Sequence, residues 1–312
     1  THALFAAKAR LARLSLCVID EQQRFGVKQR AAFLAKGERP DLLVLTATPI
    51  PRTYDLLMNG DLDKSYLREM PPGRGEVKTY VREAEAEEKI WAHLQDRIQV
   101  GDRAYVVVPR LGEEVQDPAD EASVKRTYDF LVTRFGSRRV ALLHGKMKEQ
   151  EKLRILDGFR KGEISILAAT TVVEVGVDVP EANFMVIDHA DRLGLSQLHQ
   201  LRGRIGRGGK SGKCILIQRA GGQEARERLV FLEKHRDGFL VAEEDFRIRG
   251  PGDTLGEEQS GVPRYRHARL PWDSPIFTTA DLEAVRLWQG GWHEWRGLVE
   301  AEKLARADFA AN

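Results

Sequence analysis

Seven short runs of apolar, often β-branched residues recur along the chain, and helix-forming or glycine-containing segments separate them. The runs are 15–20, 41–48, 103–109, 139–145, 164–170, 184–190 and 213–218. Runs this apolar are typical of strands that are covered on both faces. Strands that alternate with helices in this way predict an α/β fold built on a parallel, doubly wound sheet.

Between the strand-like runs, apolar residues recur at the spacing of one helical face. The predicted buried faces are Ile90, Leu94 and Ile98; then Val124, Tyr128, Leu131 and Phe135; then Leu153, Leu156 and Phe159. After residue 219 the strand pattern fades, and the charged stretches 224–236 and 279–310 predict further helices.

The segment 70–75, Met-Pro-Pro-Gly-Arg-Gly, interrupts this alternation with residues that continue neither a helix nor a strand. We therefore predict three parts, 1–72, 73–219 and 220–312. Only two strand-like runs precede the first boundary. This is too few for a closed α/β domain, so the first part is expected to be the end of a domain whose start lies upstream.

Composition narrows the class of protein. Of the 312 residues, 42% are hydrophobic and 31% are charged, which is enough apolar content to bury two cores. No run of eighteen apolar residues and no secretory signal is seen, so a cytoplasmic protein without membrane contact is expected. Cys17 and Cys214 lie inside apolar runs and are expected to be core residues.

The net charge of +2 does not by itself indicate a nucleic-acid partner. The distribution of charge is more informative, because the segment 202–219 has six basic residues and no acid. These are Arg202, Arg204, Arg207, Lys210, Lys213 and Arg219. The pattern predicts a candidate phosphate-binding surface.

Two sets of polar residues follow the first two predicted strands. Asp20 and Glu21 come directly after one strand, at the sheet edge where α/β folds bind ligands. In P-loop NTPases an acid at this place holds Mg²⁺ and its neighbour activates water, although a solvated acidic turn has the same appearance. Thr46 and Thr48 follow the next strand, where small hydroxyl residues can link such acids to a moving neighbour.

The stretch 200–208 carries the most specific pattern. On a helical turn, Arg204 and Arg207 would face the same way, so that both could reach a γ-phosphate as arginine fingers. A basic solvated helix that merely favours polyanions is the alternative. Residues 209–211, Gly-Lys-Ser, do not end a Walker A loop because Arg204 stands where glycine is required. The chain therefore contains no phosphate-cradling loop.

Taken in order, these stretches resemble the motifs of superfamily 2 helicases, and most closely those of the RecG family. Residues 20–23 resemble motif II, 46–48 motif III, 143–145 motif IV, 170–180 motif V and 200–207 motif VI. The segments 226–229, 245–253 and 255–261 resemble the family's translocation hairpin and loop. The resemblance implies an incomplete first RecA-like domain, a complete second RecA-like domain, and a helical C-terminal hairpin and tail.

The resemblance also implies a role for each matched residue. Asp20 would coordinate Mg²⁺, Glu21 would orient water, and Arg204 and Arg207 would neutralise the γ-phosphate. The residues implied to contact the nucleotide or bridge its motifs are Gln23, Gly176, Asp178, Gln200 and Gly203. Thr46 and Thr48 would provide coupling. The residues implied in DNA binding or translocation are His144, Gly145, Thr170, Thr171, Arg228, Arg249 and Gln259.

The function implied is ATP-driven translocation on double-stranded DNA that remodels forks and Holliday-type junctions. ATP and Mg²⁺ are the implied cofactors, and the implied partners are branched DNA and single-stranded DNA-binding protein, with the helicase acting as a monomer. The branch-splitting domain and the Walker A loop would precede Thr1, so this polypeptide alone should not hydrolyse ATP.

Two alternatives remain beside this interpretation. The transcription-repair coupling factor has a related motor, but Gln22 and the segments 60–63 and 71–74 favour RecG. Gln23 departs from the histidine that is usual in RecG. A catalytically inactive, helicase-like DNA-binding protein is the second alternative, and the missing phosphate loop favours it.

Overall fold

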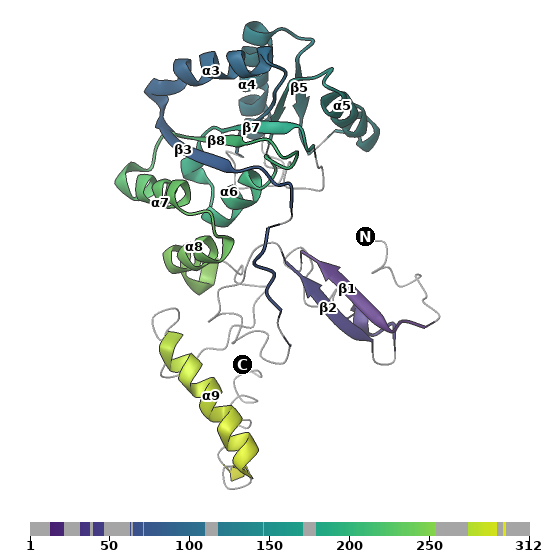
Figure 1. Cartoon of the computed structure of the whole chain (residues 1–312), viewed down its shortest axis with the longest axis vertical. Helices are drawn as coiled ribbons and strands as arrows, with labels where there is room; N and C mark the ends of the chain where they lie inside the picture. The colour runs from purple at the N-terminus through teal and green to yellow at the C-terminus, as the bar shows by residue number, and fades with distance from the viewer. Residues whose placement is uncertain are drawn as a thin grey trace. The chain divides into compact units, whose positions relative to one another are not determined.

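A computed structural model describes residues 13–21, 32–37, 40–46, 63, 65–70, 72–109, 118–145, 147–170, 179–253, 274–291 and 296–297. The chain divides into two compact units. One consists of residues 1–49 and 66–245, and the other of residues 50–65 and 246–312. Figure 1 labels the helices and strands of the chain.

Six parallel strands form the main sheet of the first unit. They are β3 (Val77–Glu83), β4 (Arg103–Val107), β5 (Val140–Leu143), β6 (Ile166–Ala169), β7 (Ala182–Ile187) and β8 (Gly212–Gln218). Their order in the sheet is β3-β8-β7-β4-β6-β5, and every pairing is parallel. The predicted parallel, doubly wound sheet is confirmed.

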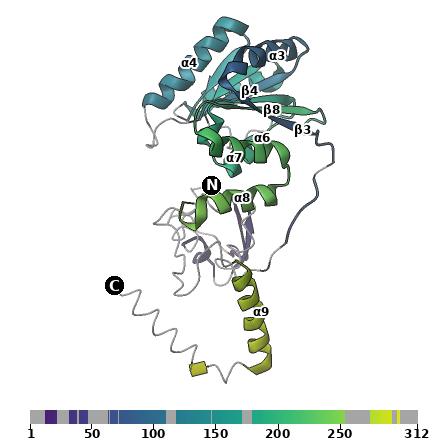
Figure 2. The same ribbon diagram turned by 90° about the vertical axis from the view of Figure 1, so that its left-hand side faces the viewer.

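Helices cover both faces of this sheet. They are α3 (Glu87–Gln99), α4 (Pro118–Phe135), α5 (Glu149–Lys161), α6 (Leu195–Arg202) and α7 (Gly222–Lys234), with short 3₁₀ turns at Ala84–Ala86 and Ala190–Arg192. Figure 2 shows α3 and α4 on one face, and α6 and α7 on the other. Two cores result, one under each layer of helices.

Alternate residues of each strand supply the two cores, since successive side chains of a strand point to opposite faces. In β4, Ala104 and Val106 belong to the core under α3 and α4, whereas Tyr105 and Val107 belong to the opposite core. Cys214 lies fully buried, and burial raises the pKa of its thiol to about 12. Cys17 is also buried, so both cysteines are core residues as predicted.

Two details differ from the sequence prediction. Strand β3 was not predicted, because only Thr79 and Val81 of its residues are buried and charged side chains stand between the apolar ones. Leu153 was predicted to share a buried face with Leu156 and Phe159, but 62% of it is exposed. The buried face of α5 lies farther along the helix, at Leu156, Gly158 and Phe159.

The remaining elements are a small sheet and two helices. β1 (Leu16–Asp20) and β2 (Asp41–Leu45) pair in parallel, with Cys17 and Ile19 packed against Phe33 on one face. On the other face Leu16 and Val18 are each about half exposed. The two helices are α8 (Gly238–Asp253) and α9 (Ser274–Gly291). No helix among the described residues is both long and apolar enough to span a membrane.

Candidate functional site

The predicted site residues of the six-stranded sheet lie at its two opposite edges. His144 follows β5 and Thr170 follows β6, so both lie at the carboxyl edge. Arg204 and Arg207 precede β8 and lie at the amino edge. A strand of seven residues is roughly 20 Å long, so the predicted DNA-binding residues and the predicted arginine fingers are well separated.

His144 and Thr170 are neighbours, because β5 pairs with β6 and the Thr170 N–H donates to the Leu143 carbonyl at 3.3 Å. Thr170 is only 7% exposed. Within the described part of the chain, its hydroxyl and Nδ1 of His144 are buried and make no hydrogen bond. Such groups can accept a hydrogen-bonding ligand at this edge without first breaking a bond. Gly145 follows His144, and Thr171, Gly176 and Asp178 lie outside the described residues.

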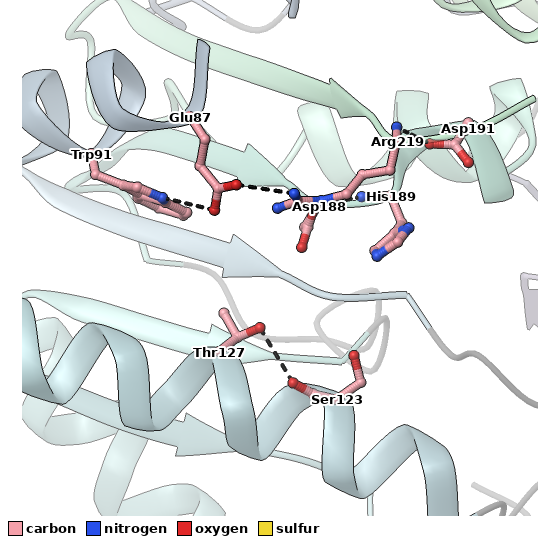
Figure 3. Close-up of polar contacts among 8 residues, drawn as sticks. All are labelled: Glu87, Trp91, Ser123, Thr127, Asp188, His189, Asp191 and Arg219. Atoms are coloured by element: carbon pink, nitrogen blue, oxygen red, sulfur yellow. Dashed lines mark hydrogen bonds and ion pairs between the residues drawn. The ribbon is translucent and has the colours of Figure 1, made fainter. Parts of the chain in front are cut away.

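A cluster of charged groups occupies the carboxyl edge at β7 and β8 (Figure 3). Arg219 donates from Nε to Asp188 at 2.6 Å and pairs with Glu87 at 3.0 Å. Its backbone N–H donates to Oδ1 of Asp191 at 2.8 Å. Burial acts to lower the pKa of Arg219, but the two carboxylates outweigh it and the pKa is raised. The arginine is therefore fixed and neutralised within the protein.

The basic residues of 202–219 do not form one phosphate-binding surface, and that prediction was wrong. Arg202 is 5% exposed, and Arg219 pairs with acids. Lys213 contacts Nε2 of His93 at 3.0 Å. Strand β8 runs from the amino edge to the carboxyl edge of the sheet between Lys210 and Arg219, so the basic side chains are distributed over both edges. These residues are therefore contiguous in the sequence but not in space.

The predicted fingers also differ from expectation in their backbone. Helix α6 ends at Arg202, and residues 203–207 form turns in which Gly206 has φ +74°. Arg204 and Arg207 are therefore not on one helical turn. Nε of Arg207 donates to the Gly203 carbonyl at 3.0 Å. Nη2 of Arg74 donates to the same oxygen at 2.9 Å.

Arg202 joins the end of α6 to the α7–α8 connection. Its Nη1 donates to the carbonyls of Leu232 and His235 at 2.8 and 2.9 Å. Its Nη2 contacts Nδ1 of His199 at 2.8 Å. The guanidinium is therefore held mainly by neutral acceptors. Nothing in the sequence distinguishes Arg202 from the neighbouring arginines, so this role was not predicted.

Asp245 of α8 caps the other end of α6. Its carboxylate accepts hydrogen bonds from the N–H groups of Leu195 and Ser196, at 2.9 and 3.3 Å. Asp245 is 7% exposed, and a carboxylate at a helix N-terminus is favoured by both the free N–H groups and the helix dipole. This contact was not predicted. Gln200 lies in α6, near the C-terminal end of the helix that Arg202 anchors.

The predicted hairpin arginines are only partly described. Arg228 of α7 donates from Nη2 to the carbonyl of Asp191, in the 3₁₀ turn that precedes α6. Asp191 also accepts from Arg219, so the hairpin is connected to the charged cluster at the carboxyl edge. Arg249 lies in α8, and Gln259 lies outside the described residues.

The predicted hydrolytic acids lie at the end of β1. The backbone N–H of Glu21 donates to Oδ1 of Asp20 at 2.9 Å, and Glu21 has φ +52°. Asp20 is in register with Leu45, so Thr46 follows at the same edge. Gln23 and Thr48 lie outside the described residues. Across the described ranges, no three His, Cys, Asp or Glu side chains form a metal-binding group.

Comparisons with known proteins identify helicase relatives of this chain. The model of the helicase conserved C-terminal domain matches residues 91–209. The ATP-dependent DNA helicase RecG of Synechocystis sp. is 43% identical over 281 residues, 90% of this chain and 34% of that protein. The same helicase of Streptococcus pneumoniae is 41% identical over 315 residues, 99% of this chain and 46% of that protein. The chain thus spans less than half of these relatives.

Among solved structures, RecG bound to a three-way DNA junction has a TM-score of 0.66 and 38% identity. The matched region makes up 89% of this chain and 35% of the RecG chain. Dbp5 of S. cerevisiae, bound to RNA and ADP BeF3, has a TM-score of 0.54 at 17% identity. The matched region makes up 76% of this chain and 61% of the Dbp5 chain, and at this low identity it supports the fold alone. The chain therefore corresponds to the C-terminal portion of RecG-type superfamily 2 helicases, and it has their RecA-like fold.

Proposed function

We propose that this chain is part of an ATP-driven motor that translocates on double-stranded DNA and remodels branched DNA, such as stalled forks and Holliday junctions. The similarity to RecG over about nine-tenths of the chain supports this function. One of the relatives is seen bound to a three-way DNA junction. We also propose that the helicase is a monomer and that it binds single-stranded DNA-binding protein.

One observation carries the proposal: helix α6 is bonded at both ends to the α7–α8 hairpin. Asp245 of α8 holds its N-terminus, and Arg202 holds its C-terminus to the connection between α7 and α8. The finger loop 203–209 follows α6 directly. These contacts would pass a displacement of the loop by a nucleotide through α6 to the hairpin, which is the coupling that a translocating motor needs.

The acids after β1 fit the chemistry proposed for them. Mg²⁺ at nucleotide sites is usually held by one or two carboxylates, by phosphate oxygens and by waters, so the exposed Asp20 is a sufficient protein ligand. When bound, the ion neutralises charge that develops on the phosphates. Glu21 would orient the attacking water. Its positive φ is uncommon for a non-glycine residue and costs about 1 kcal/mol or more, as is frequent at functional sites.

The two edges would then divide the work. Arg204 and Arg207, at the amino edge, would reach the triphosphate. Gln23, Gly176, Asp178, Gln200 and Gly203 would contact the nucleotide or bridge its motifs. His144, Gly145 and Thr170, at the carboxyl edge, would contact DNA phosphates, and Thr171 would do the same. Thr46 and Thr48 would couple the hydrolytic acids to the second RecA-like domain. Arg228, Arg249 and Gln259 would transmit the resulting movement to DNA.

Turnover of the complete helicase tests this assignment. ATP hydrolysis would be measured with a three-way junction and with linear duplex, for the wild type, Arg207→Ala and Lys210→Ala. Removing a finger is expected to lower turnover by about a thousandfold. Lys210, an exposed cation that directly follows the finger loop, serves as the matched control and should have little effect. Unchanged turnover in Arg207→Ala would refute the finger assignment, and no preference for the junction would refute the proposed substrate.

A further inference from the structure

Residues 72–76, which we name the strap, lie directly against the finger loop 203–209. The Gly75 N–H donates to the Gly206 carbonyl at 2.8 Å, and the Gly212 N–H donates to the Glu76 carbonyl at 2.8 Å. The strap then continues into β3, which pairs with β8. The strap therefore already contacts the finger loop before the pairing of β3 with β8 begins at Val77.

Glycines allow the two backbones to approach this closely. A Cβ at Gly75 would lie 1.9 Å from the Lys210 carbonyl oxygen, and one at Gly206 would lie 3.2 Å from the Gly75 carbonyl oxygen. Both neighbours are backbone atoms, which cannot move aside as a flexible side chain would. The strap and the loop are therefore fitted to each other and not merely adjacent.

One carbonyl links the strap to the predicted finger. The Gly203 oxygen accepts from Nη2 of Arg74 at 2.9 Å and from Nε of Arg207 at 3.0 Å. A carbonyl has two lone pairs and can accept both bonds at once. Both donors are charged guanidinium groups, whose hydrogen bonds are stronger than those of neutral donors. Arg74 thus holds the carbonyl of the 203–204 peptide in place, and this carbonyl in turn orients Arg207.

We propose that Arg74 is a positioning residue for Arg207, an inference that rests on the proposed function of the loop. Arg74 holds the Gly203 carbonyl so that Arg207 keeps Nε on this oxygen while its terminal nitrogens turn to a phosphate. Without Arg74, the peptide loses one of its two side-chain donors, and the finger spends less time in the productive orientation. Since an arginine bonds here through a directed N–H, a lysine replaces it incompletely.

The test compares variants of the complete helicase on a saturating three-way junction. Arg74→Met keeps an unbranched, apolar stem but removes the donors of the side chain. We expect kcat to fall about tenfold, which corresponds to roughly 1.4 kcal/mol in the barrier. The KM for ATP should change less than about twofold, because the contact orients a group and does not bind the ground state. Arg74→Lys should lie between Arg74→Met and the wild type.

A double-mutant cycle distinguishes positioning from a general loss of stability. If Arg74 acts through Arg207, Arg74→Met should add almost nothing to Arg207→Ala. Arg82→Met is the matched control, because Arg82 also lies near the start of this domain and donates to a backbone carbonyl, that of Val81, away from the loop. Equal losses in Arg74→Met and Arg82→Met, independent losses in the cycle, or unchanged kcat in Arg74→Met would each overturn the proposal.

Amide hydrogen exchange separates this proposal from the proposed function. In Arg74→Met the amides of residues 203–207 should exchange about tenfold faster, whereas they should be unchanged in Arg82→Met. If Arg207→Ala left ATP turnover intact, the finger assignment would fail, and exchange would still show whether Arg74 orders the loop. Unchanged exchange in Arg74→Met would refute the positioning role whatever the activity.

Discussion

Acid is expected to destabilise this protein through one partly buried histidine in α6. Nδ1 of His199 lies 2.8 Å from Nη2 of Arg202. Because a guanidinium can only donate, Nδ1 must be the acceptor, and the ring is therefore neutral with its proton on Nε2. Burial, followed by the charges of Arg202 and Arg74, lowers the pKa of His199 to about 4, against an ordinary value of 6.5.

The direction of the effect follows from proton linkage. Above pH 6.5 the histidine is neutral in both states and has no effect on stability. Below that value the unfolded chain binds a proton that the folded chain does not bind until about pH 4. Stability is therefore lost as the pH falls through this window. For these two pKa values the loss is about 2 kcal/mol at pH 5 and about 3 kcal/mol when both states are protonated.

Urea unfolding of the chain, followed by circular dichroism at about pH 7.5 and about pH 5, measures this loss. The matched variant is His199→Gln, since the glutamine oxygen can accept from Arg202 but does not titrate. Subtracting its pH dependence removes the contribution of every other histidine. The wild type should lose about 2 kcal/mol more than the variant between the two conditions. Equal losses, or a larger loss in the variant, would show that the ring is not held neutral.

Three further predictions concern packing, capping and charge. Gly75→Ala should cost about 2–4 kcal/mol, because its Cβ meets the Lys210 carbonyl, whereas Gly73→Ala, with φ +81° and open space, should cost about 1 kcal/mol in urea unfolding. Asp245→Ala should cost about 1–2 kcal/mol and also lower the DNA-stimulated ATPase of the complete helicase. The control Asp237→Ala, which removes a bond to the Phe239 N–H, should lower stability alone. Arg219→Met should cost about 2 kcal/mol, because it leaves Asp188 and Glu87 partly buried without their cation, and equal stability at neutral pH would contradict this.

The order of the site's motifs along the chain was predicted from the sequence, but the position of each side chain in the fold was predicted only in part. The stretches around Asp20, His144 and Thr170 were predicted at the ends of strands, and the structure has them there. Their placement could be predicted because a strand's carboxyl end is visible as the point where an apolar run stops. The helical turn predicted for Arg204 and Arg207 was wrong, because α6 ends at Arg202 and Gly206, between the two arginines, has a positive φ that a helix does not allow.

The sequence by itself determined the fold class and the buried faces of α3 and α4. The unbroken apolar run of β4 and the helical periodicity in α3 are local properties, and burial follows from them wherever the elements pack. Only the tertiary structure decided which arginines face solvent. Arg202, Arg207 and Arg219 look alike along the chain, yet one binds backbone carbonyls, one shares a carbonyl with Arg74, and one is held by two acids. Their partners come from distant segments, and the environment of a charge is set by what surrounds it in space and not by its neighbours in sequence.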